Sequence, residues 1–261
     1  MNKDELNETI NQLLPKLNGV SYSLALDKDA SKQLLVDSFT LFIMKNKSNL
    51  KKVDLNTSSN NRLDIKKLLF KELVQSLYDV FCKRSTSYKT IKNISLEYKS
   101  FSTLKPLQRA IFYLKAINDF SINNLQETFE IPHYRIMEIL HSSRSSLMIG
   151  LDPTDFDMKN IDSLSRSKFN FLTSYAYQYS ALNDREKFEA IINESPNYLK
   201  FYNQKLAERD FIYQLIPDPS LSKNEQAHLN RTLTNIIIDI FPKESLINKT
   251  FKYLNEPIIE I

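Results

Sequence analysis

Residues 104–147 read LKPLQRAIFYLKAINDFSINNLQETFEIPHYRIMEILHSSRSSL. Pro106 suits the first position of a helix, where its missing N–H loses no partner, and apolar residues then recur at helical spacing as far as Leu114. Ser121 has the side chain of a helix N-cap, so a second short helix is expected to begin after it. The chain then turns at residues 130–132 into a third helix. This stretch therefore predicts a helix-turn-helix unit preceded by one further helix.

The apolar spacing of this unit agrees with two crossed helices. Five positions have to face inward, and all five hold apolar residues: Leu125, Phe129, Ile131, Ile136 and Ile139. Two other positions depart from the ideal pattern. Gln126 stands where a small residue would let the helices approach, and Glu130 stands at the turn position that favours glycine because its φ is positive. Both departures are tolerable, with some loss of stability.

The composition is that of an ordinary globular protein and excludes several kinds of site. The chain has 261 residues, of which 42% are hydrophobic and 25% charged. Gly19 and Gly150 are its only glycines, which excludes glycine-rich phosphate-binding loops and favours an all-α fold. Cys82 is the only cysteine and permits no internal disulfide. We find no signal peptide and no apolar run long enough to span a bilayer, so we expect a cytoplasmic protein without a membrane segment.

The sequence holds no residue set that would indicate an enzyme. The three histidines, His133, His141 and His228, form no pair at metal-ligand spacing with a carboxylate, and Cys82 has no evident histidine partner. No serine lies in a glycine elbow. We therefore predict neither catalysis nor a cofactor.

The opening stretch resembles the carboxy-terminal DNA-binding region of bacterial sigma factors of the extracytoplasmic-function type. Residues 104–109 correspond to that family's leucine, proline and "LQR", residues 120–132 to "LSYEEIAEILGIP", and residues 140–144 to the "LHRAR" that ends its basic recognition helix. The resemblance implies that this helix faces the major groove of promoter DNA. The side chains that would do so are His133, Tyr134, Arg135, Met137, Glu138, His141 and Arg144.

Residues 1–44 predict two amphipathic helices separated by an acidic turn at residues 27–29. The second of them resembles the sigma-factor helix "AEDLVQDTFLRLW", which begins the region that binds core polymerase, and Asp37 and Phe39 match it. The resemblance implies that these two residues contact core RNA polymerase. Taken alone, the same helix is a core helix with an exposed aspartate.

The positive charge of the chain is concentrated in residues 45–105, which hold fourteen Lys and Arg against five Asp and Glu. A helix is expected over residues 63–81 and a Ser/Lys-rich linker after it. In the resembling family this part reads and melts promoter DNA. Phosphates would meet Lys71, Lys83 and Arg84, and unpaired bases would meet Tyr78 and Tyr88. The alternative is a helix whose lysines only keep it soluble.

Beyond an acidic linker, helices are expected over residues 167–182, 184–193, 196–215, 224–240 and 244–254, with Ser222 and Glu225 at the spacing of a capping box. This tail resembles the small helical domain of anti-sigma factors. The zinc ligands of that domain correspond to Ile191, Ser195 and Tyr198, which do not suit zinc, so we predict no metal and expect apolar packing there. The resemblance implies that the tail folds back and masks the polymerase or DNA surface.

Together these observations predict an all-α protein of three parts: a bundle like sigma region 2 (1–84), a helix-turn-helix domain like sigma region 4 (104–150) and a helical C-terminal domain (167–261). Linkers are expected at 85–103 and 151–166. The implied partners are core RNA polymerase, promoter DNA, and an anti-sigma factor or the chain's own C-terminal domain. The alternative is a regulator that docks on polymerase or on another sigma factor without reading DNA. A positive surface around Arg135 and Arg144 would favour the first function, and a neutral one the second.

Overall fold

A computed structural model describes residues 3–52, 59–84, 98–148, 163–179, 184–217 and 219–240. Every regular element in these ranges is a helix, which confirms the all-α prediction for them. The helices are α1 (Lys3–Ala25), α2 (Lys28–Lys52), α3 (Ser59–Lys83), α4 (Lys99–Ser102), α5 (Pro106–Ala116), α6 (Ile122–Phe129), α7 (His133–Leu147), α8 (Ser163–Ala176), α9 (Arg185–Glu194), α10 (Pro196–Gln214) and α11 (Lys223–Ile240). None of them combines the length and apolar character that crossing a membrane requires.

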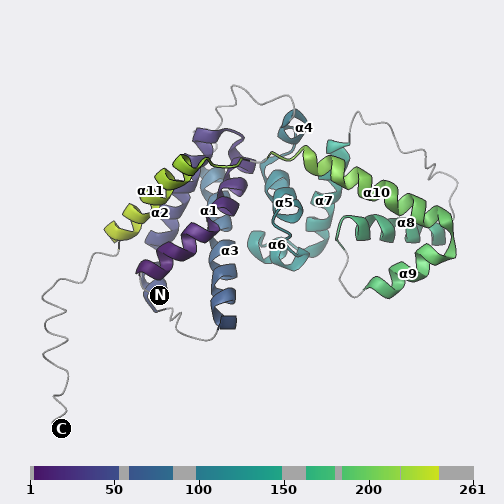
Figure 1. Ribbon diagram of the computed structural model, residues 1–261, viewed down its shortest axis with the longest axis horizontal. Helices are drawn as coiled ribbons and strands as arrows, with labels where there is room; N and C mark the ends of the chain where they lie inside the picture. Colours follow the sequence, from purple (N-terminus) through teal and green to yellow (C-terminus); the bar gives the residue numbers. More distant parts are fainter. Residues whose placement is uncertain are drawn as a thin grey trace, which may run out of the picture.

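The helices form three groups along one elongated molecule (Figure 1). Helices α1, α2, α3 and α11 make a bundle at one end, α5, α6 and α7 lie in the middle, and α8, α9 and α10 lie at the other end. Helix α10 leads the chain back toward the first bundle, where α11 packs on α1 and α2. The expectation that residues 167–261 form one C-terminal domain is therefore wrong for α11, whose Leu229, Leu233 and Ile237 are buried in the core of the first bundle.

The helix-turn-helix unit has the geometry that its sequence predicts. Pro106 begins α5, and the Ser121 side chain caps α6 by accepting the Asn124 N–H at 3.1 Å. Glu130 ends α6 in the left-handed region, with φ of 54°. A residue with a Cβ pays roughly 1–2 kcal/mol for that conformation, which is the loss expected from the absence of glycine. Leu125 and Ile136 are fully buried between the crossed helices.

Two close contacts fix this unit to the first bundle. A Cβ built on Gly19 of α1 would lie 1.8 Å from the Tyr113 hydroxyl of α5, so glycine is required for the approach of the two helices. Arg109 of α5 donates to the carbonyls of Ser23 at 2.6 Å and Leu24 at 2.7 Å, which end α1. These carbonyls have no intrahelical partner of their own, and the negative end of the helix dipole favours a cation there.

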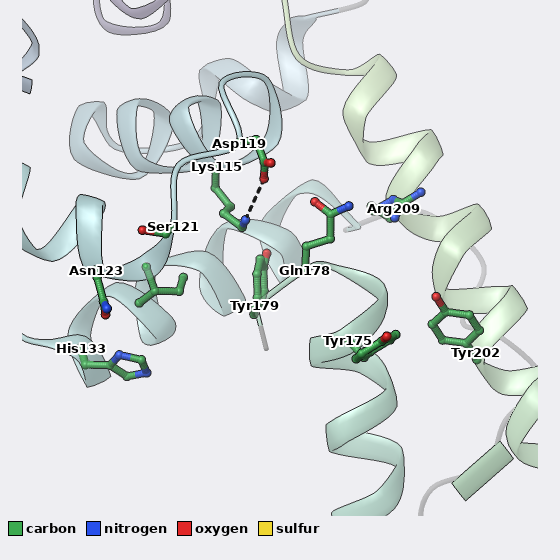
Figure 2. A pocket seen from close by; sticks show the side chains of 11 residues that line it. Lys115, Asp119, Ser121, Asn123, His133, Tyr175, Gln178, Tyr179, Tyr202 and Arg209 are labelled. Atoms are coloured by element: carbon green, nitrogen blue, oxygen red, sulfur yellow. Dashed lines mark hydrogen bonds and ion pairs between the residues drawn. The ribbon is translucent and has the colours of Figure 1, made fainter. Parts of the chain in front are cut away.

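The third group has a small core of its own, formed by Phe169, Leu172, Ile191, Tyr198 and Phe201. Apolar packing thus occupies the positions that correspond to zinc ligands, as the sequence predicts for Ile191 and Tyr198. Helix α8 begins at Ser163, inside the expected acidic linker, and α4 lies inside the expected linker 85–103. The helix expected over residues 244–254 lies outside the described residues. A cavity separates this group from the helix-turn-helix unit (Figure 2).

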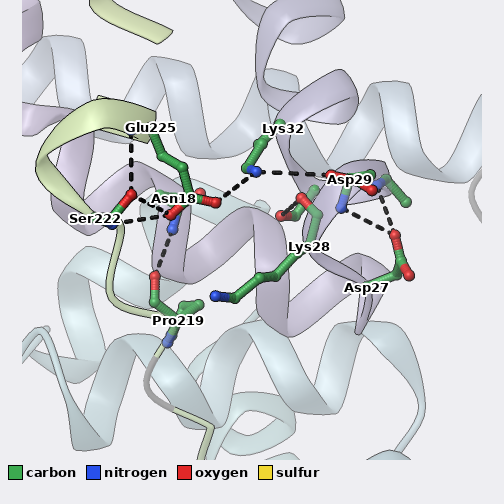
Figure 3. A network of polar contacts seen from close by, with 10 residues as sticks. Asn18, Asp27, Lys28, Asp29, Lys32, Pro219, Ser222 and Glu225 are labelled. Atoms are coloured by element: carbon green, nitrogen blue, oxygen red, sulfur yellow. Dashed lines mark hydrogen bonds and ion pairs between the residues drawn. The ribbon is translucent and has the colours of Figure 1, made fainter. Parts of the chain in front are cut away.

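Helix α11 is held to the first bundle by a polar network at its start (Figure 3). Ser222 and Glu225 form the expected capping box: the Ser222 N–H donates to Glu225 at 2.9 Å, and the Glu225 N–H donates to the Ser222 hydroxyl at 3.3 Å. The same Glu225 carboxylate accepts from Lys32 of α2 at 2.8 Å. Asn18 of α1 donates to the Pro219 carbonyl at 2.8 Å, which ties down the segment that leads into α11.

Candidate functional site

Helix α7, the expected recognition helix, is exposed mainly over its first half. Tyr134 is 69% exposed, and His133 and Arg135 also face solvent. Arg135 forms an ion pair with Glu138 one turn later, with 2.5 Å between Nη1 and Oε2. Met137 is partly buried and packs against the core. The accessible part of α7 is therefore an aromatic side chain beside an internally neutralised Arg–Glu pair.

In the second half of α7, His141 and Arg144 contact the residues that follow α8 and Glu208 of α10. The His141 ring lies edge-on to Tyr179, with 5.7 Å between ring centroids. The Arg144 guanidinium lies 5.2 Å from the centre of the Tyr177 ring, and its Nε is 3.9 Å from Oε1 of Glu208. We call these contacts of His141 and Arg144 the α7 latch, and the arrangement that they hold the closed arrangement. In it, His141 and Arg144 are partly buried against these groups, whereas the sequence expectation places both on an exposed face.

Glu208 of α10 is the centre of the latch. Its carboxylate is buried, accepts the Tyr177 hydroxyl at 2.8 Å and forms an ion pair with Lys205 as well as with Arg144. Burial and the nearby carboxylate raise the pKa of Tyr177, so the phenol stays protonated and keeps its donor. Burial, together with the Arg144 charge, lowers the pKa of His141, which favours the neutral imidazole at neutral pH. A buried carboxylate of this kind would destabilise the fold without its cationic partners.

Lys71 and Arg84, two of the other candidate cations, are also paired with carboxylates. Lys71 of α3 lies 2.9 Å from Glu127 of α6, and Arg84 lies 3.3 Å from Asp37. Lys83, at the end of α3, is exposed. Exposed ion pairs of this kind add little stability, but each one cancels the field that a phosphate would meet.

The aromatic and apolar candidates are mostly structural. Tyr78 packs edge-on against Phe129, with 5.6 Å between ring centroids, and Tyr88 lies outside the described residues. Phe39 is 2% exposed, so its expected contact with polymerase is wrong in this arrangement. The helical period places Phe39 on the same inward face of α2 as Leu35 and Phe42, both buried. Asp37 is partly accessible but already accepts from Gln33 at 2.8 Å and pairs with Arg84.

Sequence reasoning missed a cavity of about 630 Å³ between α5, α6 and α7 on one side and α8 and α10 on the other. Figure 2 shows Lys115 and Asp119 at its upper edge, His133 at one end and Arg209 with Tyr202 at the other. No local motif predicts it, because its walls come from two separate stretches of the chain, residues 115–133 and 175–209. Within the described ranges, His, Cys, Asp and Glu side chains form no group of three or more that could hold a metal ion.

Comparisons with protein-family models, with characterised proteins and with solved structures gave no match.

Proposed function

We propose that this chain is a sigma-like regulator of transcription that docks on a protein, core RNA polymerase or another sigma factor, and does not read duplex DNA in the closed arrangement. The observation that carries the proposal is the α7 latch. His141 and Arg144, which would have to reach the major groove, are packed against Tyr177, Tyr179 and Glu208 instead.

The charges of the residues expected to contact DNA support the same proposal. A protein gains affinity for a duplex when its cations replace the counterions of the phosphates. Four candidate cations are already paired with carboxylates: Lys71, Arg84, Arg135 and Arg144. A phosphate would have to displace a carboxylate at each of them, so the net gain is small. The neutral surface is the one that favours a protein partner.

The exposed half of α7 has the composition of a protein-docking surface. Tyrosine and arginine are enriched among the residues that dominate binding energy in protein interfaces, because they bury a large area and also form directed polar contacts. Tyr134 presents such a ring to solvent, beside Arg135. A partner that covers Tyr134 would bury apolar area without having to break the latch.

The test is a pull-down of core polymerase and of purified sigma factors from the same cell, followed by run-off transcription. We expect binding without initiation. Tyr134→Ala should weaken that binding by about tenfold or more, which is the loss typical of an interface hot spot. Leu199→Ala is the matched control, since Leu199 is an exposed apolar residue of α10 on another surface.

Two results would count against the proposal. Absence of binding to polymerase and to every sigma factor would remove it. Initiation in the run-off assay would select a second candidate, a promoter-reading sigma factor that the latch holds closed. One observation favours this second candidate: residues 45–105 as a whole carry fourteen basic and five acidic side chains, more cations than the paired Lys71 and Arg84, and part of that segment adjoins the helix-turn-helix unit.

A further inference from the structure

We infer that the cavity between the helix-turn-helix unit and the C-terminal helices binds a small planar anion, a ring that carries a carboxylate or a phosphate. This inference goes beyond the proposed function and does not depend on it, because it concerns only the binding of a small molecule and the stability of the closed arrangement.

The size and position of the cavity suit such a ligand. Sites for small molecules commonly enclose about 300–1,000 Å³ and lie between domains or packed helices. This cavity measures about 630 Å³ and lies between two groups of helices. Asp119 and Gln178, on opposite walls, are both held at positive φ, 51° and 56°.

The positive charge in the cavity selects an anion. The Lys115 side chain is only 6% exposed, and its contact with Asp119 is long, 3.4 Å, to a carboxylate that is 82% exposed. An ammonium group has three hydrogen-bond donors, and burying the group is unfavourable unless those donors have acceptors. Arg209 lies on the opposite wall, where it pairs with Asp210 at 2.7 Å, so Lys115 is the cation that carries the selection. Residues 121–123 bring the start of α6 to the same cavity, and of its first N–H groups that of Asn124 is already capped by Ser121.

The remaining walls select a planar group. Tyr175, Tyr179 and Tyr202 line the cavity, and their rings can stack on or meet the edge of another ring. Burial raises the pKa of Tyr179 and of Tyr202, so both phenols stay protonated at neutral pH. They do not repel an anion, and they can donate hydrogen bonds to it.

Binding there would favour the closed arrangement. A ligand that contacts Lys115 on one wall and Arg209 on the other interacts with both groups of helices at once. Such a ligand binds the closed arrangement better than an open one. The ratio of these two affinities sets how far the ligand shifts the population toward the closed arrangement.

The test titrates the full chain with salicylate, phenyl phosphate and AMP, using calorimetry and hydrogen exchange. We expect at least one of them to bind and to slow exchange of the amides in residues 140–147. Lys115→Met should weaken that binding by about tenfold or more, since the hydrogen bond it removes joins two ionised groups. Tyr202→Leu, which removes an aromatic wall, should also weaken it. The carboxylate and phosphate arms identify which anion the cavity prefers, and inorganic phosphate alone should bind more weakly than phenyl phosphate.

Lys200→Met is the matched control, because it removes an exposed lysine of α10 that lies outside the cavity. The inference is overturned when none of the three compounds binds at millimolar concentration. It is also overturned when Lys115→Met and Tyr202→Leu, shown to be folded by circular dichroism, bind as tightly as Lys200→Met.

Discussion

Arg109 is a buried cation whose hydrogen-bond acceptors are main-chain carbonyls. Besides the carbonyls of Ser23 and Leu24, it reaches that of Leu104 at 2.7 Å, so one guanidinium joins the end of α1 to the start of α5. Burial lowers the pKa of Arg109 to about 10, which still leaves the group charged at neutral pH. The planar guanidinium of arginine has five N–H donors, so it can donate to three carbonyls in different directions.

Replacing Arg109 should therefore destabilise the fold. Arg109→Met keeps the length of the side chain but removes every donor, and it leaves buried carbonyls unpaired. A hydrogen bond to a charged group is worth about 1.5–3 kcal/mol, so we expect a loss of roughly 3 kcal/mol or more in the free energy of unfolding, measured by urea titration. Arg135→Met, on the exposed half of α7, should change it by less than about 0.5 kcal/mol. Equal urea midpoints for the two variants would contradict this account.

At the level of helices, α11 shows how one capping residue links two parts of the chain. Glu225 caps its own helix through Ser222 and also pairs with Lys32 of α2. The hydrogen bond from Lys32, and then those from Ser222, lower the pKa of Glu225 to about 2. A carboxylate with a depressed pKa stabilises the folded state fully above its ordinary pKa of 4.5, and that contribution is lost as the pH falls toward 2.

Glu225→Gln should therefore lower stability at pH 7, and the difference from the natural chain should shrink between pH 4.5 and 2. The measurement is the urea midpoint of both chains across that range. Glu186→Gln is the control, because Glu186 is an exposed acid in the first turn of α9. A difference for Glu225→Gln that stays constant down to pH 2, or that equals the difference for Glu186→Gln, would show that the link to Lys32 does not contribute.

The features that the sequence predicts well are those fixed by neighbouring residues. Pro106 begins a helix, Ser121 caps one, and Glu130 takes a positive φ. All three features are predictable because each effect acts within a few residues. The capping box of Ser222 and Glu225 is predictable for the same reason. Four of these five residues therefore needed no knowledge of the tertiary fold, and the fifth, Glu225, needed it only for its bond to Lys32.

Contacts between distant segments were not predictable in this way. Nothing in α11 itself indicates that it returns to α1 and α2, because an apolar helical face fits any apolar surface of suitable shape. The resemblance placed Arg144 on a DNA-reading face, but the Tyr177 and Glu208 side chains that cover it lie more than thirty residues away. The resemblance also assigns Phe39 to a partner surface, because a match of residue types does not distinguish an exposed position from a buried one.

In the whole molecule, the helix-turn-helix unit lies between two groups of helices that the chain itself connects. Helix α10 contributes Glu208 to the latch, and the chain then leads to α11 in the first bundle (Figure 1). Deleting residues 151–261 would open the latch, but it would also strip α11 from the core of that bundle. A single substitution in the latch is therefore the cleaner way to separate the two effects.

Glu208→Gln is that substitution. It leaves Arg144 and Lys205 without the carboxylate between them, and breaking a buried ion pair by removing one partner costs roughly 3–5 kcal/mol. We expect the latch to open more often, which should speed hydrogen exchange of the amides in residues 140–147 at least tenfold. Glu194→Gln is the matched control, because its ion pair with Lys168 joins α8 to α9 and does not reach α7.

The salt dependence of DNA binding then distinguishes the two candidate functions. If the second half of α7 can meet a duplex once it is free, Glu208→Gln should bind promoter fragments more tightly than the natural chain. Its slope of log affinity against log salt should be steeper by about one, since Arg144 can then replace one more counterion. Faster exchange with an unchanged slope would mean that the latch opens without creating a DNA-reading surface, which favours the protein-docking regulator. Unchanged exchange would mean that Glu208 does not hold α7 closed.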